Sequence, residues 1–134
     1  MAKKLKTLAK LKKELQIVFN RYIRERDSEN GWFTCISCGK TKPVSEMNAG
    51  HFYPVGGYDG LRFLEDNVNG ECAGCNNFDG GHLIGYHDNL LQKIGESRLN
   101  ELKRRAKAYK MNGHKWTRHD LSEMINKYKL KNGN

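Results

Sequence analysis

Two Cys-x-x-Cys pairs, separated by residues 39–71, hold all the cysteines of this chain: Cys35, Cys38, Cys72 and Cys75. Four thiolates suit the tetrahedral coordination of Zn²⁺, and a sphere filled by four thiolates leaves no open position for catalysis. In a cytosolic protein such pairs bind metal more often than they form disulfides. Met1–Lys6 is basic and lacks the apolar run of a secretory signal. We therefore predict a structural zinc site; reduced thiols or a redox pair are the alternatives.

The low hydrophobic content favours a small fold that a metal ion stabilises, and the positive net charge favours a polyanionic partner. Hydrophobic residues make up 37% of the 134 residues, so a bound metal would add needed stability to a limited core. Lysine and arginine number 24 against 15 acidic residues, which gives a formal net charge of +9. This excess favours nucleic acid as the partner. No apolar stretch reaches the length of a membrane span, so we expect no membrane contact.

The apolar pattern predicts an α+β fold in one domain, residues 1–134. Spacings of three and four predict a basic helix within residues 1–30, ending near Arg26. Residues 31–82 are predicted to form a small core with strands at 32–36 and 49–53 and a helical turn at 76–79. Residues 83–134 are predicted to be helical, with a break at Gly95 and a last helix capped by Thr117. Residues 1–6 and 131–134 are expected to be disordered.

Three polar residues of this core are candidates for chemistry: His51, Asn67 and Asn76. His51 precedes a glycine-rich loop, Asn67 precedes the second Cys pair, and Asn76 follows that pair at the predicted start of a helix. This order resembles the HNH, or ββα-metal, nucleases. The resemblance implies a small ββα-metal core stapled by the four-cysteine zinc site. It also implies that His51 is the general base, that Asn67 holds the loop which orients the imidazole, and that Asn76 faces a catalytic Mg²⁺ or Mn²⁺.

The chemistry of phosphodiester hydrolysis explains these residue types. The reaction needs a base that deprotonates water and a cation that stabilises charge on the phosphate. Imidazole, with an ordinary pKa of about 6.5, suits the first role, and amide oxygens suit Mg²⁺. Many HNH enzymes place a metal ligand immediately before the base, but here that residue is Gly50. The other candidate ligands are Asn48, on the same strand face as Gly50, Asp79, one helical turn after Asn76, and His82.

A longer set of motifs resembles the NinG (Rap) recombination proteins of lambdoid phages. The matching segments are 22–27, 35–39, 49–52, 61–63, 67–68, 72–76, 81–83, 94–96 and 115–117. The resemblance implies a phage-encoded, structure-specific endonuclease of the host cytoplasm that cuts branched DNA such as Holliday junctions and D-loops. Symmetric resolution of a junction takes two cuts, so we expect a homodimer that uses the apolar stripes of the first and last helices. Phage recombination proteins are expected as further partners.

Basic side chains in and around the predicted core are candidates for phosphate contacts. The DNA-binding candidates are Arg62, Lys10, Lys12, Arg104 and Arg105. Arg62 lies between the expected base and the expected metal-binding helix, and an ion pair with Glu65 or Asp66 is its alternative role. Trp32, Phe52 and Tyr58 either stack on splayed bases or pack in the core. No segment resembles a base-reading helix, so we expect recognition of DNA shape.

Two other functions remain open from the sequence. The first is a zinc-ribbon DNA-binding protein without catalysis, in which His51 is structural. The second is a phage adaptor that binds other proteins through its long basic helices. A plain zinc module has no need of the combination of His51, Asn67 and Asn76, and an adaptor predicts no salt-dependent DNA binding.

Overall fold

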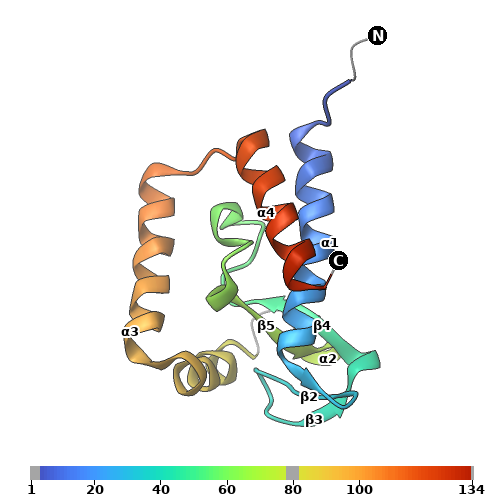
Figure 1. The fold of residues 1–134 in the computed structure, drawn as a ribbon. Coiled ribbons are helices and arrows are strands. Elements are labelled where there is room, and N and C mark those ends of the chain that lie inside the picture. The colour runs from blue at the N-terminus through green and yellow to red at the C-terminus, as the bar shows by residue number, and fades with distance from the viewer. Residues whose placement is uncertain (1–3, 78–81, 134) are drawn as a thin grey trace.

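Two helices from opposite ends of the chain lie side by side in the computed structural model, which describes residues 4–77 and 82–133 (Figure 1). Helix α1 (Leu8–Arg26) is capped by the side chain of Thr7, which accepts from the backbone N–H of Lys10 at 3.1 Å. Helix α4 (Arg118–Lys131) is capped by Thr117, as predicted. Both helices run in the same direction, because the Arg118 guanidinium donates to the Lys6 carbonyl and Asn132 donates to the Val18 carbonyl.

The first hydrophobic core lies between these two helices, the loop that contains Phe63 and the strand that begins at Val68. Its buried members are Leu11, Leu15, Phe19, Ile23, Phe63, Val68, Leu121, Ile125 and Tyr128. The apolar stripes of α1 and α4 are therefore covered within one chain. The prediction that these stripes form a dimer interface is wrong, because burying them against each other already removes them from water. The predicted disorder of residues 131–134 is also wrong at its start, since α4 includes Lys131 and Asn132 is buried.

In the described residues, five short strands form two antiparallel sheets. Strands β1 (Ser28–Glu29), β2 (Trp32–Thr34) and β3 (Thr41–Pro43) form one, and β4 (Met47–His51) pairs with β5 (Val68–Cys72) in the other. Short 3₁₀ turns occupy Val44–Glu46, Asp59–Leu61 and Glu65–Asn67. The strand predicted at 32–36 ends at Thr34, because the backbone N–H of Cys35 bonds to the Lys40 carbonyl and begins a turn.

Strand β4 differs from the prediction at both ends, and the helix after β5 differs by one turn. The strand predicted at 49–53 is instead Met47–His51, because the side chain of Asn67 bonds both backbone groups of Tyr53 and draws that residue out of the ladder. Helix α2 spans Ala73–Asn76. Asn76 is thus the last residue of this helix, whereas the sequence placed it at the start.

The long helix α3 (Leu83–Asn112) covers the other side of the loop that joins β4 to β5 (Figure 1). Its backbone is non-helical at Gly95, where φ is 84°, as the predicted break requires. The second hydrophobic core lies between this helix and the loop, and its buried members are Ile36, Leu61, Tyr86, Leu90, Leu99, Leu102 and Ala106. The loop is therefore held between two cores. None of the helices in the described part of the chain combines the length and apolarity of a bilayer crossing.

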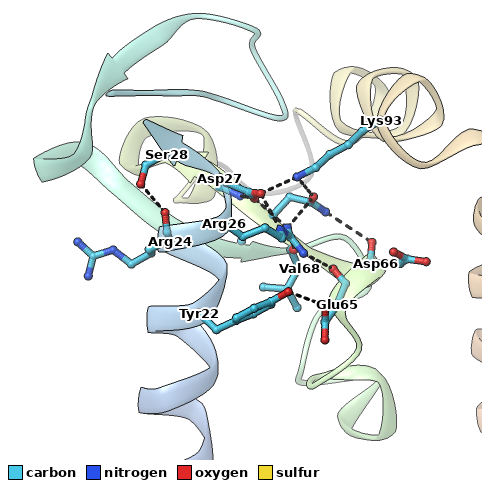
Figure 2. A network of polar contacts seen from close by, with 12 residues as sticks. Tyr22, Arg24, Arg26, Asp27, Ser28, Glu65, Asp66, Val68 and Lys93 are labelled. Atoms are coloured by element: carbon cyan, nitrogen blue, oxygen red, sulfur yellow. Dashed lines mark hydrogen bonds and ion pairs between the residues drawn. The ribbon is translucent and has the colours of Figure 1, made fainter. Parts of the chain in front are cut away.

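A polar network joins the end of α1 to β5 and α3, as Figure 2 shows. Arg26 donates to the carbonyl oxygens of Glu65 and Val68 and to Oδ1 of Asn69, at 2.8–3.1 Å. Asp27 accepts from Arg26, from the backbone N–H of Gly70 and from Nζ of Lys93. Burial alone would raise the pKa of Asp27, but Arg26 and Lys93 hold it below its ordinary value. The network fixes β5, and with it the hairpin that carries His51, against two helices.

Candidate metal and nuclease site

The four cysteines meet at one point, between the turn after β2 and the junction of β5 with α2. Their Sγ atoms all lie within 4.8 Å of one another. Zn–S bonds of about 2.3 Å in a tetrahedron require sulfur atoms about 3.8 Å apart, so a small inward movement accommodates zinc. The sulfur of Cys35 accepts from the backbone N–H groups of Cys38 and Cys72, at 3.5 and 3.3 Å. Such donors stabilise a thiolate, and the cluster can bind a metal ion such as zinc.

His51 stands at the end of β4 with its ring oriented by the loop. Its Nε2 lies 3.1 Å from the backbone carbonyl oxygen of Arg62. A carbonyl oxygen only accepts, so this contact places the imidazole proton on Nε2 and leaves the lone pair on Nδ1. Burial lowers the pKa of His51, partly opposed by the bond to the Arg62 carbonyl. The ring is therefore neutral at neutral pH, with one nitrogen available as a base.

Asn67 closes the loop that carries the Arg62 carbonyl. Its fully buried side chain accepts from the Tyr53 N–H at 2.8 Å and donates to the carbonyls of Tyr53 and Leu61, both at 3.1 Å. These bonds tie the start of the loop to the residue just before Arg62. The geometry thus matches the loop-holding role that the sequence suggested for Asn67.

Glu71 is the residue that sequence reasoning missed. It lies on β5 directly opposite Asn48 on β4, and its side chain covers Gly50. It is 6% exposed, and Ser37, from the first Cys-x-x-Cys pair, donates to its carboxylate. Burial raises the pKa of Glu71, while the Ser37 bond and the nearby His82 act in the opposite direction. The one signal in the sequence is a carboxylate immediately before Cys72, and its meaning depends on the strand register.

The other predicted ligands are brought together only in part. Asn48 is half-buried opposite Glu71, and His82 interacts electrostatically with Glu71 from the residue preceding α3. Asn76 is exposed at the end of α2. Asp79 lies outside the described residues. Within the described ranges, no hydrogen bond joins His51 to Glu71, Asn48 or Asn76.

Arg62 and Lys12 share a carboxylate beside the loop. Asp59 accepts from Nη1 of Arg62 at 3.0 Å and from Nζ of Lys12 at 3.1 Å, while Gln16 of α1 accepts from Nε and Nη2 of Arg62. The alternative ion pair of Arg62 with Glu65 or Asp66 is wrong. Glu65 instead accepts from Tyr22, Tyr128 and Lys131, and Asp66 from Arg98.

The remaining DNA-binding candidates are spread over two helices. Lys10 is exposed on α1. Arg104 and Arg105 are exposed on the second half of α3 and line a hollow with the loop residues Gly60 and Leu61. Phe52 packs on Tyr53 with ring centroids 5.0 Å apart, and Tyr58 packs on Tyr53 at 4.9 Å, so these aromatics are part of the structure's packing. Trp32 remains 53% exposed.

Comparison with known proteins gives one consistent family. The family described as Bacteriophage Lambda NinG protein matches residues 1–133. Curated relatives named "Protein ninG" include those of Escherichia phage 933W, 33% identical over 119 residues, and of Escherichia phage lambda and Salmonella phage P22, each 32% identical over 119 residues. These alignments cover 89% of this chain and 54–55% of the relatives, so the chain spans about half their length. No solved structure matches the chain.

Proposed function

Because this chain belongs to the NinG family of phage proteins, we propose that it is a metal-dependent endonuclease of the HNH type. Its substrates are branched recombination intermediates such as Holliday junctions and D-loops. The catalytic cation is Mg²⁺ or Mn²⁺, and zinc in the four-cysteine cluster is structural. The protein works in the cytoplasm of the host cell as a homodimer alongside phage recombination proteins.

The contact between His51 and the Arg62 carbonyl carries this proposal. The contact fixes the neutral tautomer with the proton on Nε2, which is the form that a general base requires. With Nε2–H bonded to the carbonyl, Nδ1 of His51 takes a proton from the attacking water. The low pKa that burial imposes keeps the ring ready to accept this proton at neutral pH.

The neighbouring residues supply the other requirements of the reaction. A bound cation supplies positive charge that stabilises the phosphate and the leaving oxygen. Asn76, Asn48 and His82, with Asp79, are the side chains that would hold it, and their oxygen and nitrogen donors suit Mg²⁺ or Mn²⁺. Asn67 fixes the loop, and therefore the position of the carbonyl that orients His51. Asn67 is thus a positioning residue.

Positive side chains next to the loop favour DNA as the substrate. Arg62 and Lys12 flank the loop, Lys10 lies on α1, and Arg104 and Arg105 lie across from it on α3. These groups contact phosphates and make binding salt-dependent. Their spread over two helices suits a branched substrate, whose arms present phosphates on more than one side.

A cleavage assay separates the proposed function from the two alternatives. Labelled four-way junctions and linear duplexes are incubated with the protein in Mg²⁺, in Mn²⁺ and in a chelator. We expect metal-dependent cutting of junctions that His51→Ala lowers by about 10²-fold or more, the contribution of a general base. His119→Ala on the exposed face of α4 is the control and should cut like the wild type.

The alternatives give different results in the same assay. Junction binding without metal-dependent cutting supports the non-catalytic zinc-ribbon protein. Absence of salt-dependent DNA binding supports the adaptor. Equal cutting by wild type and His51→Ala would refute the assigned base.

A further inference from the structure

The register of the β4–β5 pair places the carboxylate of Glu71 over Gly50, the residue without a side chain. Asn48 pairs with Glu71, and Gly50 pairs with Asn69, so these four positions face the same side of the hairpin. A Cβ atom built on Gly50 would lie 2.2 Å from Oε1 of Glu71 and 2.8 Å from its Cβ. A side chain at position 50 would therefore need the volume that Glu71 fills.

Glu71 is costly to bury without a compensating partner. It is 6% exposed, and a buried carboxylate is stable only when it is paired with a cation or well supplied with hydrogen-bond donors. Ser37 donates a hydrogen bond to Oε2. The other carboxylate oxygen, Oε1, points over Gly50, where a ligand of the cation is expected.

The groups around this oxygen are also suited to a divalent ion. Asn48 lies directly across the hairpin, and His82 is close enough to interact electrostatically with Glu71. Ser37 belongs to the turn between Cys35 and Cys38, so the zinc cluster fixes the donor that orients the carboxylate. A ligand held by a second residue in this way is common in metal sites.

From this geometry we infer that Glu71 supplies, from β5, the anionic ligand of the catalytic cation that Gly50 cannot supply from β4. The inference rests on the proposed nuclease function and names the cation ligand within it. Ser37 is then a positioning residue for that ligand. A purely structural role, in which Glu71 only anchors Ser37, is the competing explanation.

Binding of Mn²⁺ to the zinc-loaded protein tests the ligand directly, without any cleavage. The electron paramagnetic resonance signal of free Mn²⁺ gives the dissociation constant. We expect Ser37→Ala to weaken binding about 10-fold, within the range found when a ligand loses its support, and Glu71→Ala, which removes the ligand itself, to weaken it by at least about 100-fold. Glu123→Gln, an exposed carboxylate on α4, is the control and should bind Mn²⁺ as the wild type does.

An exchange across the hairpin makes the test specific to position. Gly50→Asp alone should disturb folding, because its Cβ collides with Glu71. The double variant Gly50→Asp with Glu71→Gly removes both the carboxylate and the Cβ of residue 71 that lies 2.8 Å away, and it returns a carboxylate to the same place. We expect it to recover Mn²⁺ affinity to within about tenfold of wild type. Zinc content and circular dichroism confirm that each compared variant is folded.

The outcomes separate this inference from the proposed function. Wild-type Mn²⁺ affinity in Glu71→Ala overturns the inference, whether or not junctions are cut. The inference is also overturned if Glu71→Ala loses Mn²⁺ affinity and the double variant that carries Gly50→Asp does not recover it. In that case Glu71 does not replace a ligand at position 50. Binding of Mn²⁺ that depends on Glu71, without junction cleavage, supports the ligand and overturns the nuclease. A wild-type protein that binds no Mn²⁺ overturns both.

Discussion

Replacement of Asn67 by alanine should both destabilise the protein and misplace the base. The substitution removes three hydrogen bonds, to the N–H and carbonyl of Tyr53 and to the carbonyl of Leu61. At about 1 kcal/mol each, these bonds contribute about 3 kcal/mol. The Leu61 carbonyl keeps the hydrogen bond that it accepts from the backbone N–H of Leu64, and water can reach the half-buried Tyr53, so no buried group is left unpaired. We expect the free energy of unfolding to fall by about 3 kcal/mol.

Urea unfolding measures this loss at a fixed concentration of free zinc, because a bound metal shifts the apparent stability. Asn126→Ala, an exposed change on α4, is the matched control and should stay within about 0.5 kcal/mol of wild type. Asn67→Asp should be at least as damaging as Asn67→Ala, since its carboxylate would face the two carbonyl oxygens that Nδ2 now contacts.

Cleavage by Asn67→Ala is measured under conditions in which the variant is still folded, below its unfolding transition. Because the Leu61 carbonyl precedes the Arg62 carbonyl that orients His51, we expect a lower kcat with little change in DNA affinity. A stability loss under about 1 kcal/mol would contradict the hydrogen-bond reasoning. A full loss of stability with unchanged kcat would show that the loop does not orient the base.

Three further predictions concern the zinc cluster, the polar network and the base. Cys72→Ser should leave the protein zinc-free or unfolded; stoichiometric zinc with a native melting curve in that variant would contradict the structural role. Asp27→Asn should cost about 3 kcal/mol in urea unfolding at pH 7, whereas the exposed Asp88→Asn should cost almost nothing. Because the pKa of Asp27 in the folded protein is below its ordinary value of 3.8, this contribution is present above that value and is lost as pH falls through the lower one, so wild type and Asp27→Asn should converge in acid. The pKa of His51 is lowered from 6.5 by burial, so the cleavage rate should rise with pH and reach half of its plateau value below pH 6.5; a rate that still rises steeply above pH 7 would contradict a neutral, buried base.

The helices and the cysteine cluster could be predicted from the sequence because their signals are local. The apolar spacing of α1, the Thr117 cap of α4 and the break at Gly95 each depend on residues within a few positions of one another. The Cys-x-x-Cys spacing likewise confines each pair to one turn. That the two pairs meet, with sulfurs within 4.8 Å, is what the metal hypothesis required.

The errors came from interactions between residues far apart in the chain. The strand predicted at 49–53 stops at His51 because Asn67 bonds the backbone of Tyr53. The α1 and α4 stripes looked available for a partner because the sequence does not show that they cover each other. Arg62 was paired with its sequence neighbours Glu65 and Asp66, whereas Asp59 and Gln16 of α1 are its partners.

Gly50 shows why a nuclease pattern written along one strand is an incomplete test of the site. In an antiparallel pair, residues directly opposite each other lie closer together than alternate residues of one strand, and diagonal neighbours that face the same side, such as Gly50 and Glu71, are still within reach of a long side chain. A carboxylate carried by β5 can therefore occupy the same position in space as one carried by β4. This requires the β4 residue to be small enough to leave room for it. Gly50 meets that condition, because any Cβ there would collide with Glu71. The glycine that makes the HNH pattern look defective along the sequence is, on this reasoning, the feature that allows Glu71 to complete it.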